Sequence, residues 1–173
     1  MKEELKEKLI NIKLMVFDID GTLTDGSIYY GHQGEMFKRF GAKDGMGITL
    51  LRKSEIKTAF LTSEESEINI KRANKLKVNA LVQGSHNKSE DLKSLCKSFN
   101  LKLFECGFVG DDINDLHAMS IAGFSAAPSS SSNPILENVD FVSKYKGGKG
   151  AVREIIEMLL LSQNKSIILQ ENW

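Results

Sequence analysis

Short apolar runs alternate with longer amphipathic stretches along most of this chain. Four apolar runs are of strand length, and we expect strands at residues 13–18, 56–62, 80–82 and 105–109, followed by short apolar pieces at residues 124–126 and 141–142. The amphipathic stretches have apolar side chains at helical spacing. We expect helices at residues 44–53, 64–77, 88–99 and 150–162, one that follows Gly110 and runs to about residue 122, and a short charged helix or arm at residues 2–11. Asp44 is the predicted N-cap of the helix at 44–53.

This alternation of strands and helices predicts an α/β fold, in which helices cover both faces of a mostly parallel sheet. The length of 173 residues suits a single domain that spans residues 1–173. There is no internal repeat and no long linker. The serine-rich stretch at residues 129–134 is too short for a linker and is predicted to be a surface loop.

Residues 27–40 depart from the alternation. Two strand-like runs surround a glycine-bounded turn at residues 31–34, which predicts a protruding β-hairpin. An isolated hairpin is marginally stable in water, so we expect its large apolar side chains to cover the protein's own site or to pack on another subunit. The tail at residues 163–173 is also apolar for a chain end and finishes in Trp173.

The overall charge argues against two classes of partner. Lys and Arg number 23, as do Asp and Glu, so the formal net charge is zero and favours neither a nucleic acid nor an anionic membrane. The two cysteines, Cys96 and Cys106, lack metal-site spacing and are predicted to be buried or half-buried thiols of a reducing compartment. The N-terminus is densely charged, and no apolar run has membrane-spanning length. We therefore expect a cytoplasmic protein.

Polar side chains follow several of the predicted strands. Asp18 and Asp20 follow the first strand, Thr62 the second, and Asp111 the strand at 105–109, while Lys88 begins a helix. The carboxyl ends of parallel strands meet at one edge of a sheet, where ligands bind in such folds. Carboxylates, Mg²⁺ and a lysine together suit phosphoryl transfer, and an aspartate can be its nucleophile. The sequence therefore predicts a phosphoryl-transfer site at this edge.

These motifs resemble those of the haloacid dehalogenase superfamily of phosphatases. The matching segments are residues 17–24, residues 61–63, Lys88 and residues 109–115. Residues 24–30, 40–48, 83–88 and 147–154 extend the resemblance over nearly the whole chain, to the capless subgroup that acts on sugar-acid phosphates. That subgroup includes phosphatases of 3-deoxy-D-manno-octulosonate 8-phosphate and of nonulosonate (sialic acid and ketodeoxynonulosonate) 9-phosphates, which serve lipopolysaccharide and sialic acid biosynthesis.

The resemblance implies a Rossmann-like fold with a β-hairpin in place of a cap domain, and a homotetramer in which a neighbour helps to close the site. It also implies a Mg²⁺-dependent reaction through an aspartyl-phosphate. Asp18 is the implied nucleophile and a metal ligand, and Asp20 the implied acid and base, with its backbone carbonyl on the metal. Asp111 completes the implied ligands. The remaining implied roles are the orientation of metal waters and Lys88 by Asp112 and Asp115, and the binding of phosphoryl oxygens by Thr62 and Lys88.

The resemblance further implies a substrate pocket lined by Gly41, Ala42, Lys43, Asp44 and Gly45, with Arg72 reaching the sugar acid. Two residues depart from the octulosonate enzymes: Glu64 and Thr49 stand where those enzymes typically have arginine. Two guanidinium groups that could bind a carboxylate are therefore absent. Glu64 is more similar to the nonulosonate branch, so both substrates remain open.

Two other functions are compatible with parts of the pattern. One is a non-catalytic oligomerisation module, similar to the C-terminal module of animal CMP-sialate synthetases (acylneuraminate cytidylyltransferases). The other is a phospho-receiver domain, which also uses Asp, Thr and Lys on a parallel sheet. A receiver needs its phospho-accepting Asp at the end of a middle strand, and here Thr62 stands there. The presence of Asp18, Asp20, Lys88 and Asp111 favours the enzyme.

Overall fold

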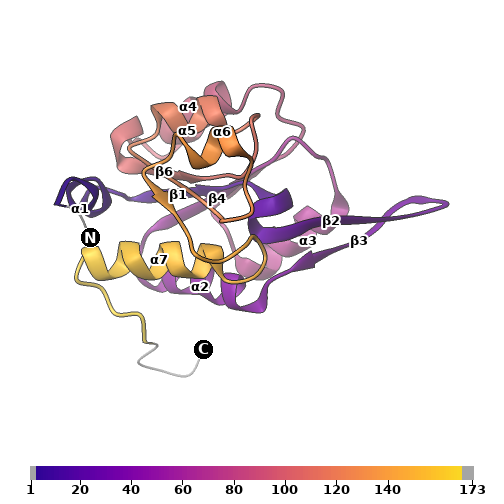
Figure 1. Ribbon diagram of the computed structural model, residues 1–173, viewed down its shortest axis with the longest axis horizontal. Helices are drawn as coiled ribbons and strands as arrows, with labels where there is room; N and C mark the ends of the chain where they lie inside the picture. Colours follow the sequence, from indigo (N-terminus) through magenta and orange to yellow (C-terminus); the bar gives the residue numbers. More distant parts are fainter. Residues whose placement is uncertain (1–2, 169–173) are drawn as a thin grey trace.

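The computed structural model describes residues 3–168, and a parallel six-stranded sheet lies at its centre (Figure 1). The strand order is β5-β4-β1-β6-β7-β8. The strands are β1 (Leu14–Phe17), β4 (Lys57–Leu61), β5 (Ala80–Val82), β6 (Cys106–Val109), β7 (Phe124–Ala127) and β8 (Phe141–Val142). Each neighbouring pair in this sheet is parallel, which confirms the predicted α/β fold.

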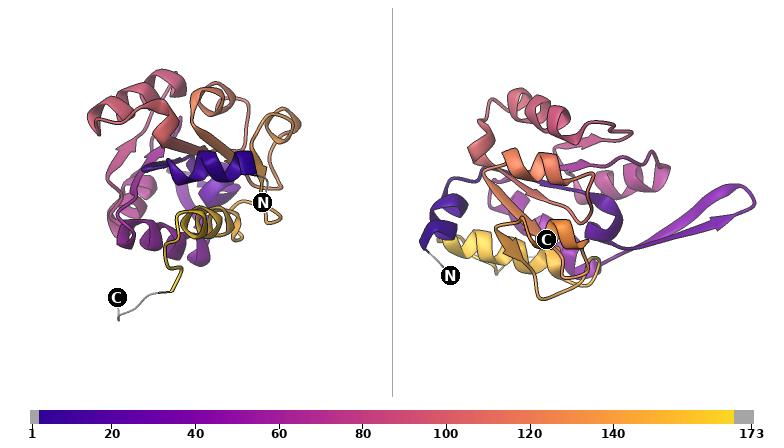
Figure 2. Two further views of the ribbon diagram at one scale, coloured as in Figure 1. Left: turned by 90° about the vertical axis from the view of Figure 1, so that its left-hand side faces the viewer. Right: turned by 45° about the horizontal axis from the view of Figure 1, so that its top comes forward.

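Helices cover both faces of the sheet (Figures 1 and 2). One face packs against α1 (Glu3–Ile10), α2 (Ala42–Lys53), α3 (Glu67–Leu76) and α7 (Ala151–Ser162). The other packs against α4 (Lys88–Ser98), α5 (Leu116–Ile121) and α6 (Asn133–Leu136). The short helix η2 (Leu103–Glu105) leads into β6.

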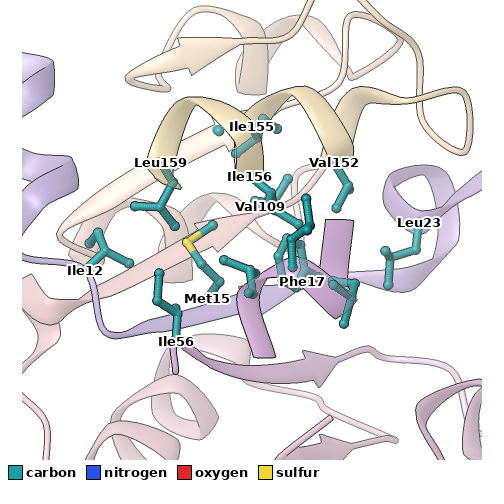
Figure 3. Close-up of a cluster of buried hydrophobic side chains, with 14 of the residues drawn as sticks. Ile12, Met15, Phe17, Leu23, Ile56, Val109, Val152, Ile155, Ile156 and Leu159 are labelled. Atoms are coloured by element: carbon teal, nitrogen blue, oxygen red, sulfur yellow. The ribbon is translucent and has the colours of Figure 1, made fainter. Parts of the chain in front are cut away.

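Side chains of the central strand alternate between two apolar cores. Met15 and Phe17 of β1 point into the core beneath α7, and Figure 3 shows them beside Val152, Ile156 and other α7 side chains. Leu14 and Val16 point into the opposite core, under α4 and α5. Because each fully buried side chain of this size contributes about 1.5–3 kcal/mol, β1 is a stable base for the residues that follow it.

The predicted hairpin is present, although it begins earlier than expected. β2 (Thr24–Gly31) and β3 (Gly34–Phe40) pair antiparallel and extend away from the body of the protein (Figure 2). Tyr29 and Phe37 stack with their ring centroids 4.4 Å apart, and both rings are about half exposed. Tyr30 and Met36 are more exposed still. The ribbon therefore presents an apolar surface to the surroundings.

The prediction that Asp44 caps α2 is wrong. Gly41 is the N-cap, and Asp44 lies buried inside the first turn. The Asp44 carboxylate instead accepts hydrogen bonds from the backbone N–H groups of Gly150 and Arg153, both at 3.0 Å. These groups belong to the start of α7, whose own N-cap is a glycine without a side chain. Asp44 therefore caps a helix that begins more than 100 residues further along the chain.

Four smaller predictions concern the serine-rich loop, the cysteines, membrane-spanning helices and the apolar tail. The predicted loop at 129–134 is partly structured, since Ser131 is buried and α6 begins at Asn133. Cys96 and Cys106 are free and buried, as predicted. Within residues 3–168, no helix is long and apolar enough to cross a membrane. Of the apolar tail, Ile167 packs on the core, while Trp173 lies outside the described residues.

Candidate active site

Three carboxylates meet at the carboxyl edge of the sheet. Asp18 directly follows β1, and Asp111 and Asp115 lie in the loop between β6 and α5. Each of the three offers one oxygen, and these oxygens lie within 4.8 Å of one another. β1 and β6 are hydrogen-bonded neighbours, so the fold brings together residues that are almost 100 positions apart. This arrangement confirms that the strand-end aspartates Asp18 and Asp111 converge.

The ammonium group of Lys88 joins two of these carboxylates. Its Nζ lies 2.7 Å from Oδ1 of Asp18 and 2.6 Å from Oδ1 of Asp115. Lys88 is the first residue of α4 and follows the N-cap Asn87, whose side chain accepts the N–H of Glu90. Burial alone would lower the pKa of Lys88, but the charges of Asp18 and Asp115 raise it above its ordinary value. Lys88 is therefore a fixed cation in this site.

Asp115 orients Lys88, whereas Asp112 does not. Asp115 is fully buried, and its Oδ2 accepts the backbone N–H groups of Asp111 at 3.0 Å and Asp112 at 3.3 Å. The Asp112 side chain is exposed and accepts the N–H of Ile113 instead. Among the described contacts, Asp115 bonds to Lys88 and Asp112 does not, and the predicted roles of both residues stay predictions. One carboxylate oxygen of Asp115 accepts hydrogen bonds from the loop backbone, and the other accepts a hydrogen bond from Lys88.

The cluster has an excess of negative charge. Burial, followed by repulsion from Asp115, raises the pKa of Asp18 well above its ordinary value. The same two causes raise the pKa of Asp111 to about 7. Three carboxylates face a single ammonium group, so a divalent cation would compensate the remaining charge. Oxygen donors at this spacing are the ligands that such a cation prefers.

A tight turn, η1 (Ile19–Leu23), lets the loop after β1 approach Asp111. Gly21 has φ +84°, and a Cβ atom there would lie 1.9 Å from Oδ2 of Asp111. The hydroxyl of Thr22 donates to Oδ1 of Asp111 at 3.2 Å. Gly147 packs against the backbone of Gly21 so closely that it also has no room for a Cβ. The turn therefore requires glycine for both its conformation and its contacts.

The carboxylate of Asp20 faces Lys38, a residue that the sequence reasoning missed. Lys38 lies on β3 and its side chain is completely buried. Its Nζ is 2.7 Å from Oδ2 of Asp20 and 3.6 Å from Oε1 of Glu35. The alternation of Phe37, Lys38, Arg39 and Phe40 could have revealed it, since Phe40 faces inward and Lys38 shares its side of the strand.

Thr62 takes its expected place at the end of β4. It is buried, its N–H donates to the carbonyl of Val82, and its hydroxyl accepts the N–H of Glu64 at 3.3 Å. A hydrogen bond of 3.3 Å from the Asn114 side chain to the hydroxyl of Ser63 joins this loop to the loop of Asp111. The loops after β4 and β6 thus meet at the same edge.

The residues predicted to bind substrate occupy different surroundings. Ala42, Gly45, Thr49 and Arg72 line a cavity of about 540 Å³ between α2 and α3. Lys43 lines a second cavity of about 440 Å³ beside the start of α7. Glu64 is exposed, while Asp44 is buried and bonded to α7 as described above. Neither cavity is lined by Asp18 or Lys88, so both cavities are separate from the carboxylate cluster in the described part of the chain.

Arg72 has a defined position in the first of these cavities. Its guanidinium group donates to the carbonyl of Gly41 at 3.3 Å and stacks over the ring of Phe40, 5.0 Å from the centroid. Burial lowers the pKa of Arg72, and the charge of Asp44 opposes that shift. The same cavity is lined by other cationic side chains, namely Arg52, Lys53, Lys75 and Lys77, and by no acidic residue.

Comparison with known proteins places this geometry in a family. The family model of haloacid dehalogenase-like hydrolases matches residues 47–156. The chain belongs to the haloacid dehalogenase-like hydrolase family. Its membership confirms the predicted resemblance, and the chain is a phosphoric monoester hydrolase.

Curated relatives and solved structures agree with this placement. The chain is 34% identical to 3-deoxy-D-manno-octulosonate 8-phosphate phosphatase KdsC of Yersinia pestis, over 94% of this chain and 87% of that protein. A crystal structure of the 3-deoxy-D-manno-octulosonate 8-phosphate phosphatase of Moraxella catarrhalis contains magnesium ion, phosphate ion and KDO. It superposes on this chain with a TM-score of 0.91 at 35% sequence identity, over 95% of this chain and 94% of the other. The cobalt-bound Haemophilus influenzae protein matches equally well, at 35% identity with a TM-score of 0.91, covering 95% and 96%.

Proposed function

We propose that this protein is a Mg²⁺-dependent phosphatase of a 2-keto-3-deoxy sugar-acid phosphate. The observation that carries the proposal is the buried cluster in which Lys88 joins Asp18 and Asp115, next to Asp111. Relatives that share about a third of the sequence over most of the chain are named as phosphatases of 3-deoxy-D-manno-octulosonate 8-phosphate. The complete cluster argues against a non-catalytic oligomerisation module.

Asp18, Asp111 and the backbone carbonyl of Asp20 are the proposed Mg²⁺ ligands. The geometry supports this assignment, because oxygens of Asp18 and Asp111 lie within 4.8 Å of each other, where a divalent cation would offset the repulsion between the carboxylates. When bound, the ion neutralises charge on the phosphoryl oxygens. Lys88, with Thr62, balances the remaining charge from the protein side.

The first proposed half-reaction transfers the phosphoryl group to Asp18. A carboxylate oxygen of Asp18 forms a bond to phosphorus while the bond from phosphorus to the sugar oxygen breaks. Asp20 gives its proton to that leaving oxygen, so the sugar acid departs as an alcohol. Lys88 holds Oδ1 of Asp18 at 2.7 Å and fixes the direction of attack.

The second half-reaction returns Asp18 to its starting state. Asp20, now a carboxylate, takes a proton from water, and the water oxygen forms a bond to phosphorus. The bond between Asp18 and phosphorus breaks, which releases inorganic phosphate and regenerates the protonated Asp20. Protons and oxygens balance over the cycle: one ester and one water give one alcohol and one phosphate.

The cavity between α2 and α3 is the proposed site of carboxylate recognition. Its cationic lining attracts the carboxylate that a sugar acid carries in addition to its phosphate. Arg72 presents a planar donor group, and the Nε atom is buried without a hydrogen-bond partner in the structure. Because Asp18 does not line this cavity, we propose that the cavity binds the carboxylate of a substrate held in the active site of a neighbouring subunit.

Octulosonate 8-phosphate is the first candidate substrate because the named relatives act on it. A nonulosonate 9-phosphate is the second candidate, and two residues favour it. Glu64 is exposed beside Thr62, and Thr49 donates its hydroxyl to the carbonyl of Gly45. Neither can replace an arginine as a bidentate donor to a carboxylate.

A homotetramer is the proposed assembly. The exposed apolar surface of the hairpin, formed by Tyr29, Tyr30, Met36 and Phe37, supports it, because such a surface is costly to leave in water. The cytoplasmic location stays a prediction.

Phosphate release from a substrate panel tests the proposed function. The panel contains octulosonate 8-phosphate, a nonulosonate 9-phosphate and glucose 6-phosphate, each with and without Mg²⁺. We expect Mg²⁺-dependent release with the highest kcat/KM for one of the two sugar acids, and loss of that release in Asp18→Asn. Equal rates in the wild type and Asp18→Asn, or a preference for glucose 6-phosphate, would contradict the proposal.

A further inference from the structure

Lys38 is a buried charged residue at a position where the hairpin does not need a charge for its own stability. It lies on β3 between two exposed neighbours, Phe37 and Arg39, yet its side chain has no exposed surface. Its backbone pairs with Ile28 on β2. A buried ammonium group is unfavourable unless it is paired, and an apolar side chain would stabilise such a site at least as well.

The pairing of Lys38 makes the two oxygens of Asp20 different from each other. Oδ2 receives the ammonium group at 2.7 Å, whereas Oδ1 is buried and has no hydrogen-bond partner in the structure. Glu35 lies 3.6 Å from the same ammonium group and is too far to replace Asp20 as its hydrogen-bond acceptor. Oδ2 is therefore anchored, whereas Oδ1 has no hydrogen-bond partner among the described residues.

We propose that Lys38 is a positioning residue, which anchors Oδ2 of Asp20 so that Oδ1 faces the oxygen of the leaving group. The inference rests on the proposed function, in which Asp20 transfers the proton. Lys38 itself touches neither substrate nor metal in this account. It acts through Asp20, and it links the orientation of that side chain to the hairpin that carries it.

Leaving groups of different basicity distinguish this role from a structural one. The alkoxide of a sugar needs a proton when its bond to phosphorus breaks, whereas p-nitrophenolate leaves without one. In Lys38→Met, we expect single-turnover cleavage of the preferred sugar-acid phosphate to fall about 100-fold. Release of the first p-nitrophenol from p-nitrophenyl phosphate should fall by less than about 5-fold. Loss of a merely structural contact would slow both esters alike.

Two further variants complete the test. Arg39→Met removes the same charge from the next position on β3, where the side chain is 63% exposed, and should change neither rate. The double variant Asp20→Asn/Lys38→Met should be no slower than Asp20→Asn, because Lys38 acts only through Asp20. Should Lys38→Met fail to fold, Lys38→Gln, which keeps a donor but no charge, is compared on the same two esters.

Equal losses for the two esters, or a further loss in the double variant, would overturn the role of Lys38. Unchanged rates in Lys38→Met, beside an active wild type, would overturn it as well while leaving the proposed function intact. A wild type that cleaves neither ester would instead contradict the proposed function. The two failures are therefore separable.

Discussion

The carboxylate centre and the surface between α2 and α3 differ in how completely one chain forms them. At the centre, Asp18, Lys88 and Asp115 are all at most 5% exposed and are bonded to one another. On the surface between α2 and α3, cationic side chains line a cavity of about 540 Å³ and bind no acidic partner across it. The carboxylates of the centre share one buried ammonium group and keep an excess of negative charge, whereas the cavity has an excess of positive charge.

This difference indicates how the two tasks are divided. Phosphoryl transfer depends on fixed positions and compensated charge, which a buried network on rigid strand ends provides. In the proposed function, recognition of the substrate carboxylate belongs to the separate cavity between α2 and α3. Changes at the centre should therefore affect every phosphate ester, and changes in the cavity only those with a carboxylate.

The largest expected effect comes from Asp115 at the centre. Asp115→Asn removes the charge that orients Lys88 and weakens the loop of Asp111, so kcat should fall about 100-fold on any ester. Asp112→Asn is the matched control, because Asp112 is adjacent, acidic and exposed. Steady-state rates with p-nitrophenyl phosphate and a sugar-acid phosphate measure both. A comparable loss in Asp112→Asn would show that the centre extends further than the described contacts.

A smaller and more selective effect is expected from Arg72. Arg72→Met removes a charged hydrogen-bond donor from the cavity, and KM for the sugar-acid phosphate should rise about 10- to 30-fold. The rate with p-nitrophenyl phosphate should stay within about 2-fold, since that ester has no carboxylate. Lys71→Met changes the neighbouring exposed lysine on α3 and provides the control. Equal losses for both esters would mean that Arg72 supports the centre through Gly41 and Phe40 instead.

Glu64 should change the preference between the two sugar acids by a smaller factor. Glu64→Arg adds a guanidinium group beside Thr62, which should raise the ratio of kcat/KM for octulosonate 8-phosphate over nonulosonate 9-phosphate about 5-fold. Glu65→Arg adds the same charge one residue further along. The ratio of the two specificity constants is the measurement, and a ratio that moves equally in both variants would exclude a specific role for Glu64.

The smallest expected effect is on stability. Asp111 has a pKa of about 7 in the folded protein and about 3.8 in the unfolded chain, so the folded state binds more protons between these values. Stability of the metal-free protein should therefore fall as pH rises from about 4 through about 7, by a few degrees in Tm. The slope should flatten in Asp111→Asn and remain in Asp112→Asn. Thermal unfolding across this pH range measures it, and a rise in Tm would contradict the charge excess.

Local signals in the sequence predicted most of the centre. Asp18 and Asp111 each follow a short apolar strand, and parallel strands end at one edge, so their meeting needs only the strand pattern. The positions of Thr62 and Lys88 follow from the same reasoning. Helix starts were less predictable, since α2 begins at Ala42 rather than at 44.

Contacts that depend on distant parts of the chain were not predictable. Asp44 has the sequence signature of an N-cap, but the start of α7 at Gly150 competes for its carboxylate and receives it. The alternation along the strand could place Lys38 on its inward side, but the contact with Asp20 depends on how the fold sets β3 beside the turn after β1. Asp112 and Asp115 look alike in the sequence, and only the turn of their loop buries one and exposes the other.

Trapping the phosphorylated enzyme tests the central claim most directly. The holoenzyme with Mg²⁺ is mixed with its preferred sugar-acid phosphate, quenched in acid within a single turnover, digested and analysed by mass spectrometry. The account predicts one phosphoryl group on the peptide that contains Asp18, and none in Asp18→Asn. Turnover without a phosphorylated Asp18, or a phosphoryl group on another residue, would contradict it.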